Sequence, residues 1–168
     1  MGATVSTSSD TIVFTSQRIN MTVFAETQVN ATSVTGMHPP SYAQGDVFVM
    51  GGLIDPTLYI PVGASVTFTV VNMDSAMYND MVVSTVGPPF PVNMSKYMTW
   101  SGYGMGMMGS GFQGFLYMMP VLSPANYASG WAPYYSYTIT FPNVASLWYL
   151  CTYPGHAESG MYGEIIAT

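Results

Sequence analysis

The only cysteine of the chain, Cys151, lies near the C-terminus in the stretch LWYLCTYPGHAESGMYGEII. His156 follows five residues later, and Met161 follows five residues after that. A Pro-Gly pair at 154–155 and Gly160 interrupt the stretch, which predicts a tight loop between two apolar strands. A thiolate, an imidazole and a thioether on one short loop form a soft ligand set of the kind that selects copper.

A simpler interpretation is a buried thiol, a surface histidine and a packing methionine that share this spacing by chance. The chain has 15 methionines, so a methionine close to a histidine is unremarkable by itself. A single cysteine with His at +5 and Met at +10, framed by Pro-Gly and Gly, is much less expected by chance. We therefore favour a metal site at this loop.

The pattern Cys-x4-His-x4-Met on the last loop of a small β-protein resembles the cupredoxins, the blue copper electron carriers. The closer resemblance is to the acid-stable branch of that family, whose ligand loop is similar to CTYPGHAESGMYGEI here. Further similar segments are a strand at 55–66, a strand and turn at 81–90, and an N-terminal hairpin at 11–25. The stretch 93–132 lies outside the resemblance.

The resemblance implies an all-β fold, a cupredoxin-like Greek-key β-sandwich with a methionine- and aromatic-rich insertion. A chain of 168 residues fits one domain with a sizeable core. We therefore expect a single cupredoxin domain over residues 1–168, with residues 1–10 flexible and residues 93–133 as the insertion.

In this family a type 1 copper ion is held by two histidines, a cysteine and a weak axial methionine. The resemblance therefore implies copper as the cofactor, with Cys151, His156 and Met161 as metal ligands. The family's first histidine corresponds here to Asn79, in MYNDMVV, and Asp80 follows it. Three of the four expected ligands are present, with Asn79 in the position of the fourth.

An amide oxygen at Asn79 is a hard donor and a poor match to Cu(I). The sequence leaves three arrangements open: a vacant or weakened site, a site with three protein ligands completed by water or an anion, and a site completed by His38. His38 is the only other histidine and lies in the proline-rich segment GMHPPSY. An exposed loop residue is the simpler interpretation of such a histidine.

Charged side chains are rare, at 6% of the chain against roughly 25% in soluble proteins. Arg18 and Lys96 are the only basic side chains, which excludes a nucleic-acid surface because such a surface needs many phosphate contacts. A protein with few paired carboxylates loses little stability when acid protonates them. The composition predicts a protein that works in strong acid. The alternative interpretation is an exported protein with an ordinary polar surface.

No run approaches the 18 or more apolar residues of a membrane helix, so we expect no spanning segment. The start MGATVS has neither the basic nor the apolar part of a signal peptide. As the resemblance implies, we expect a monomer in the periplasm or outside the cell, at the outer face of the cytoplasmic membrane. Its expected partner is a redox protein such as a cytochrome.

The apolar pattern predicts many short strands and no convincing helix beyond short pieces within the insertion. The expected strands are 11–14 and 21–24, joined by a turn at 16–18, followed by 46–50, 57–60, 65–72, 81–85, 134–141 and 146–150. In one of them Val66, Phe68 and Val70 should share a buried face. The segment 28–45 is expected to be irregular.

The insertion combines methionine with aromatic residues. Its members are Met94, Met98, Met105, Met107, Met108, Met118 and Met119, with Trp100, Tyr103, Phe112, Phe115, Tyr117 and Trp131. Methionine that fills irregular gaps is one interpretation. An apolar cover that excludes water from the copper site is a second, and a sulfur surface that binds Cu(I) directly is a third.

These patterns predict a type 1 copper protein that shuttles one electron in an acidophile's extracytoplasmic respiratory chain, with a site altered at Asn79. The alternatives are a copper-binding or storage protein and a non-redox surface protein that retained the fold. An enzyme is not expected. Cys151 and His156 suggest a nucleophile with its base, but no helix start or oxyanion loop accompanies them, and no phosphate loop or zinc motif is present.

Overall fold

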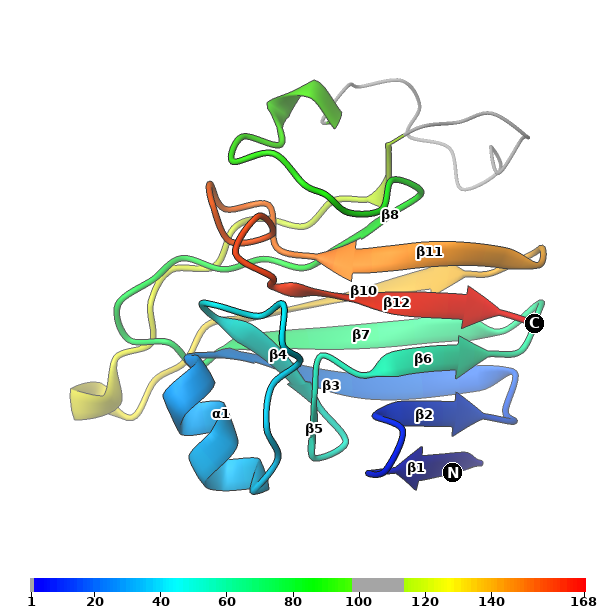
Figure 1. Cartoon of the computed structure of the whole chain (residues 1–168), viewed down its shortest axis with the longest axis horizontal. Helices are drawn as coiled ribbons and strands as arrows, with labels where there is room; N and C mark the ends of the chain where they lie inside the picture. The colour runs from blue at the N-terminus through cyan, green and yellow to red at the C-terminus, as the bar shows by residue number, and fades with distance from the viewer. Residues whose placement is uncertain (1, 98–113) are drawn as a thin grey trace.

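Figure 1 shows a chain made mostly of short strands, in a computed structural model that describes residues 2–97 and 114–168. Within these ranges, one sheet contains β1 (Ala3–Ser6), β2 (Thr11–Phe14), β6 (Thr57–Ile60), β8 (Val82–Ser84), β9 (Phe115–Tyr117), β11 (Ala145–Leu150) and β12 (Tyr162–Ala167). The other contains β3 (Arg18–Glu26), β4 (Val47–Met50), β5 (Leu53–Ile54), β7 (Ser65–Asn72) and β10 (Tyr134–Thr140). The described helices are α1 (Gln28–Thr35), η1 (Ser95–Tyr97) and η2 (Tyr127–Ser129).

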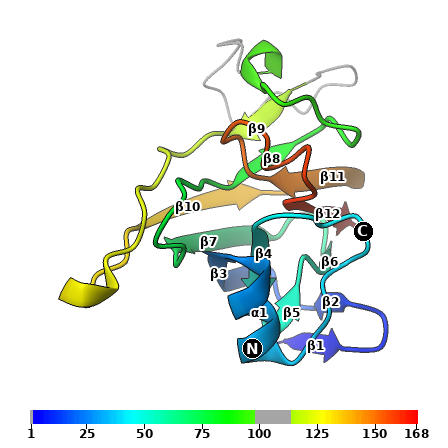
Figure 2. The ribbon, with the colours of Figure 1, turned by 60° about the vertical axis from the view of Figure 1, so that its left-hand side comes forward.

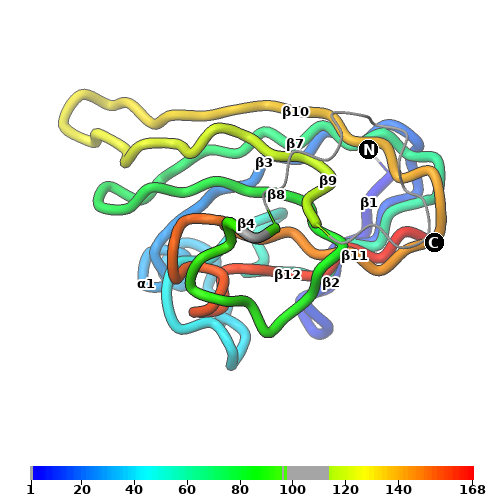
Figure 3. Tube along the Cα trace, turned by 90° about the horizontal axis from the view of Figure 1, so that it is seen from above, coloured from blue at the N-terminus to red at the C-terminus, as the bar shows by residue number. Residues whose placement is uncertain are grey.

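The two sheets pack face to face as two layers, which Figure 2 and Figure 3 show from two further directions. The larger sheet has the strand order β1-β2-β6-β12-β11-β8-β9, and the smaller has the order β10-β7-β3-β4-β5. Both sheets are mixed, because β6 pairs in parallel with β12 and β3 pairs in parallel with β7. The expected cupredoxin-like β-sandwich is confirmed.

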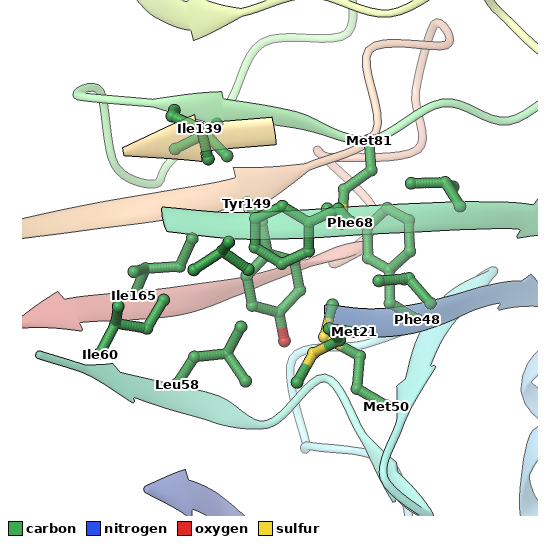
Figure 4. Close-up of a cluster of buried hydrophobic side chains, with 14 of the residues drawn as sticks. Met21, Phe48, Met50, Leu58, Ile60, Phe68, Met81, Ile139, Tyr149 and Ile165 are labelled. Carbon is green, nitrogen blue, oxygen red and sulfur yellow. The ribbon is translucent and has the colours of Figure 1, made fainter. Parts of the chain in front are cut away.

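Strand β7 shows how the sequence produces the core between the layers. Its residues alternate between half-buried and buried, so Val66, Phe68 and Val70 face inward as predicted. Figure 4 shows Phe68 close to Phe48 and Tyr149 in the shared core. The rings of Phe48 and Tyr149 meet edge to face, with centroids 5.7 Å apart. Period-two burial on facing strands therefore supplies the apolar layer that holds the sheets together.

The two N-terminal strands do not form the expected hairpin. Strand β2 pairs with β1 and in parallel with β6, whereas β3 pairs with β4 and β7 in the other sheet. The turn at 16–18 therefore carries the chain from one layer to the other. Strand β1 lies within residues 1–10, which are expected to be flexible. Its side chains are mostly exposed, so its contacts are mainly the backbone pairing with β2.

Helix α1 lies in the segment that was expected to be irregular. Thr27 caps its start by accepting a hydrogen bond from the Asn30 N–H at 3.3 Å, and Gly36 ends it with a φ of 69°. Its sequence QVNATSVT is rich in polar and β-branched residues and lacks an apolar period, and Ala31 is its only buried residue. Neither α1 nor the other described helices have the length and apolarity to cross a membrane.

The described part of the 93–133 insertion joins the larger sheet, because β9 pairs antiparallel with β8. Around η2 the chain extends away from the sandwich, as the three ribbon and tube views agree (Figures 1–3). Met94 and Met119 are buried in hydrophobic clusters, which fits the gap-filling interpretation for these two. The methionines between 98 and 113 lie outside the described residues, so their three interpretations stay predictions.

Candidate metal centre

The predicted loop with Cys151, His156 and Met161 connects β11 to β12. In Figure 1 it lies at the left-hand end of these two strands. The strands pair antiparallel up to Leu150 and Tyr162, and beyond them the Cys151 N–H donates to the Met161 carbonyl oxygen at 3.2 Å. The sheet register therefore places the cysteine and the methionine directly opposite each other.

Glycines set the shape of this loop, as predicted. Gly155 has a φ of 86° and Gly160 a φ of 99°, values that side chains with a Cβ rarely adopt. A Cβ on Gly160 would lie 2.4 Å from the Tyr42 carbonyl oxygen, so only glycine fits there. The Met161 N–H donates to the His156 carbonyl oxygen at 3.0 Å. The loop is thus held largely by its own backbone.

Three side-chain atoms converge beside this loop. Cys151 Sγ lies 3.5 Å from Asn79 Oδ1 and 3.6 Å from His156 Nδ1. Asn79 Oδ1 and His156 Nδ1 are 2.9 Å apart. The point equidistant from the three atoms is about 1.9 Å from each, while zinc in proteins keeps roughly 2.0–2.3 Å to nitrogen and sulfur. The triangle is therefore close to the size of a trigonal metal site.

Asn79 reaches the site from the loop that follows β7. It is fully buried, and its backbone N–H and carbonyl oxygen pair with Leu122 at 3.1 and 2.8 Å. The position that resembled the family's first ligand is therefore brought to Cys151 and His156. His38 is exposed in the segment after α1 and takes no part in the hydrogen bonds that join the other three side chains.

Burial dominates the electrostatics of the site. It raises the pKa of the Cys151 thiol well above its usual range, and the nearby Asp80 carboxylate raises this pKa further. Burial also lowers the pKa of the His156 imidazole, while the charge of Asp74 acts in the opposite direction. Both shifts favour the neutral forms of these two side chains, and the Cys151 thiol would release its proton when a metal binds.

Asp80 ties the two loops of the site together. Its Oδ1 accepts from the Thr152 N–H at 2.6 Å, and its Oδ2 accepts from the Thr152 hydroxyl. Burial raises the pKa of Asp80, and the two hydrogen bonds from Thr152 lower it. The residue after Asn79 is thus bound to the residue after Cys151. Nothing in the sequence pointed to Thr152.

Sequence reasoning also missed the polar residues behind Asn79. Asn79 Nδ2 donates to Asn72 Oδ1 at 3.1 Å and to Asp46 Oδ2 at 3.3 Å. Burial and the nearby Asp74 carboxylate raise the pKa of Asp46 to about 7. The one available signal was Asn72, a polar residue in the inward register of β7, two positions after Val70.

His156 is the part of the site nearest to solvent. Cys151, Met161 and Asn79 are fully buried, whereas His156 is half-buried. The Tyr153 ring meets the imidazole edge to face at 4.9 Å. Aromatic contacts therefore hold the outer edge of the imidazole.

The donor set fits a soft or borderline metal. Thiolate, imidazole and thioether ligands suit copper, whereas calcium and magnesium prefer oxygen throughout. Among the described residues there is no group of three or more His, Cys, Asp and Glu side chains that could hold a metal. Cys151, His156 and Asn79 therefore form a candidate centre of mixed donors, with Met161 opposite Cys151 in the backbone register and the amide oxygen as the one hard donor.

Known proteins similar to this chain are rusticyanins, although no family model matches it. The chain is 26% identical over 166 residues to rusticyanin of Acidithiobacillus ferridurans, across 95% of this chain and 68% of that protein. It is also 26% identical to a rusticyanin of Acidithiobacillus ferrooxidans, across 95% of this chain and 82% of that protein. The structure of reduced rusticyanin superposes with a TM-score of 0.67 and 21% identity, across 95% of this chain and 85% of that one.

Proposed function

We propose that this chain, whose homology to rusticyanin supports its assignment to the cupredoxin family, is a one-electron carrier that holds one copper ion. The proposed ligands are Cys151, His156, Met161 and Asn79. The observation that carries the proposal is the convergence of Cys151 Sγ, His156 Nδ1 and Asn79 Oδ1 within 3.6 Å of one another. When bound, copper supplies the one-electron Cu(II)/Cu(I) couple.

Each of these residues contributes a different property. Cys151 provides the thiolate, and its complete burial keeps water away from the sulfur. Met161 is equally buried and provides a weak thioether donor. Asn79 provides an oxygen, which favours Cu(II) over Cu(I) more than a second imidazole would. We therefore expect a lower reduction potential than the same scaffold would have with histidine at 79.

Contacts that involve no metal hold these groups close together. They are the hydrogen bond from the Cys151 N–H to the Met161 carbonyl oxygen and the Asp80–Thr152 pair. A site that is cross-linked in this way moves little when the charge of the ion changes. Small reorganisation of this kind is what one-electron transfer requires.

Copper loading tests the proposed function. We expect about one copper per chain and an intense visible absorption from thiolate-to-copper charge transfer, bleached by one electron and restored on reoxidation. Cys151→Ser should remove this absorption, whereas Met118→Leu, at an exposed methionine of the insertion, should leave it unchanged. Several Cu(I) ions per chain without the absorption would instead favour copper storage, and no bound copper would favour a non-redox surface protein.

Electron exchange is proposed to occur through the His156 edge, with a redox protein such as a cytochrome as partner. Tyr78 is 46% exposed and stacks on Tyr153, which contacts the imidazole. A negative charge in this place, Tyr78→Glu, should slow electron exchange with a c-type cytochrome. Tyr134→Glu, on the exposed face of β10, is the matched control and should have no effect. Equal rates for both variants would contradict this assignment.

The proposed setting is acidic and outside the cytoplasm, as for a carrier of an acidophile's respiratory chain. Asp55 supports it, because burial raises the pKa of this carboxyl well above its usual range. Its Oδ2 has no hydrogen-bond partner among the described residues. A carboxyl with a higher pKa when folded stabilises the protein fully below its unfolded pKa, and this contribution is lost as pH rises through the folded pKa. Asp55 thus favours the folded state in acid.

Asp55→Asn tests this acid preference in the metal-free protein. Asparagine tolerates the φ of 48° at this position and keeps a side-chain oxygen that can accept from the Phe48 N–H. In the wild-type protein Asp55 Oδ1 accepts this hydrogen bond at 2.8 Å. Wild-type stability in urea should fall from pH 4 to pH 7, by at most about 1.4 kcal/mol per pH unit for each proton involved. The variant should show a smaller fall. Asp10→Asn, at an equal φ, controls for the exchange itself.

A further inference from the structure

We propose that Asn72 and Asp46 are positioning residues that turn the amide oxygen of Asn79, and not its NH2 group, toward Cys151 and His156. The inference rests on the proposed copper site and concerns the orientation of one side chain within it. An amide NH2 group donates two hydrogen bonds and offers no lone pair to a metal, whereas the amide oxygen offers two. The orientation of Asn79 therefore decides whether this residue can serve as a donor.

The orientation of Asn72 follows from the backbone around it. Its Nδ2 donates to the carbonyl oxygens of Met77 and Ser123, at 2.9 Å each, and lies 3.4 Å from that of Leu122. Its Oδ1 accepts from the Asp74 N–H at 3.1 Å. The reversed amide would place an oxygen against carbonyl oxygens and an NH2 group against an N–H, and a buried residue cannot relieve either conflict with water.

Asn72 in turn determines the orientation of Asn79. The oxygen of Asn72 is 3.1 Å from the nearest atom of the Asn79 amide, so that atom must be a donor, Nδ2. Asp46 Oδ2 lies 3.3 Å from the same nitrogen and provides a second acceptor. Both N–H bonds of the amide are then used on the side away from the metal centre. Its oxygen is left to face Cys151 and His156.

The oriented oxygen has a use in the protein without metal as well. His156 Nδ1 lies 2.9 Å from it and Cys151 Sγ lies 3.5 Å from it, so it accepts from a protonated ring nitrogen and from the thiol. A bound metal would need both donor atoms without their protons: the thiol would release its proton to solvent, and the neutral imidazole would carry its single N–H on Nε2 instead of Nδ1. The lone pairs of the Asn79 oxygen would then be free for the metal. One fixed amide would thus organise the site with and without a metal.

NMR of the metal-free protein tests the orientation directly. In protein labelled with 15N and 13C, the side-chain NH2 of Asn79, assigned by its loss in Asn79→Asp, should exchange slowly with solvent. It should also show couplings across hydrogen bonds to the side-chain carbonyl carbons of Asn72 and Asp46. Short proton distances from this NH2 group to the Cys151 sulfur-bearing carbon and the His156 ring, without those couplings, would overturn the proposal. No metal is needed, so this result is independent of the copper proposal.

A matched pair at Asp46 separates positioning from charge. Asp46→Ala and Asp46→Asn both remove the carboxylate, but only asparagine keeps an oxygen that can accept from Asn79 Nδ2. In competition with a chelator, Asp46→Ala should weaken Cu(II) binding about tenfold and shift the visible spectrum, and Asp46→Asn should restore most of both. Glu164→Ala removes a half-buried carboxylate of β12 and controls for net charge. Equal weakening by the two Asp46 variants would overturn the positioning role.

Discussion

Two loops meet at the candidate metal centre, and they are held in place in different ways. The loop 151–161 is shaped by its own glycines and backbone hydrogen bonds, such as that from the Met161 N–H to the His156 carbonyl oxygen. The loop 73–80 depends on distant partners, among them Leu122 and Asp46. The shape of the first loop is thus visible largely within a short stretch of sequence, although Val92 and Gln44 also bond to its backbone. The shape of the second loop is not.

Gly160→Ala should have the largest effect and tests how tightly the first loop is built. Alanine would have to adopt the φ of 99° found at this position, and its Cβ would lie 2.4 Å from the Tyr42 carbonyl oxygen. We therefore expect the free energy of unfolding, measured in urea, to fall by about 3 kcal/mol or more. Gly155→Ala is the control: its φ is 86° but the space around it is open, so the expected loss is about 1 kcal/mol. Similar losses would mean that packing against 42–43 does not constrain the loop.

Asn72→Ala tests the support that the end of β7 and the segment around Ser123 give to the second loop. It leaves the part-buried carbonyl oxygens of Met77 and Ser123 without their donor, which should cost about 2 kcal/mol in urea unfolding of the metal-free protein. Asn126→Ala, at an exposed asparagine that caps η2, should cost about 1 kcal/mol. If Asn72→Ala costs no more than this control, the second loop is held by its own residues after all.

Asn79→His exchanges the hard oxygen for an imidazole at the tip of the second loop. We expect copper affinity to rise about tenfold, because imidazole suits copper better than an amide oxygen. The metal-free protein should lose about 1–2 kcal/mol, because a larger ring must enter a fully buried position. Chelator competition and urea unfolding measure the two effects. The exposed Asn93→His is the matched control, and an unchanged affinity in Asn79→His would argue against ligation at 79.

The smallest expected effect concerns the contact between the two loops. Tyr78 of one loop stacks on Tyr153 of the other with ring centroids 5.9 Å apart and planes inclined by 17°. Tyr78→Ala should cost about 0.5–1 kcal/mol in urea unfolding. Tyr134→Ala, at a ring that is 69% exposed, should cost almost nothing. Equal values for the two variants would leave Asp80 and Thr152 as the link between the loops.

Local pattern accounts for the parts of the molecule that the sequence predicted well. Val66, Phe68 and Val70 alternate with polar residues, and the strand that contains them buries the three side chains. The spacing of Cys151, His156 and the glycines placed a tight loop after β11, and the thiol and imidazole do converge there. In both cases the signal lies within a dozen residues, where backbone geometry alone relates the side chains.

Local pattern failed where distant segments compete. Strands 11–14 and 18–26 are neighbours in sequence, but each pairs with a strand of a different sheet. No feature of the turn between them predicts this pairing. Helix α1 had a capping threonine and a terminal glycine but no apolar stripe between them. Only the residues at its two ends therefore indicated a helix.

Residue types and their spacing were enough to predict the sandwich, the C-terminal loop and the thiol, imidazole and thioether on it. That Asn79 turns its oxygen toward Cys151 and His156 depends on how distant segments of the chain pack. The reason is physical: the two ends of an amide differ only in their hydrogen bonds, and those of Asn79 come from Asn72 and from Asp46, 33 residues away. Such an orientation exists only after the segments that carry its partners have packed together.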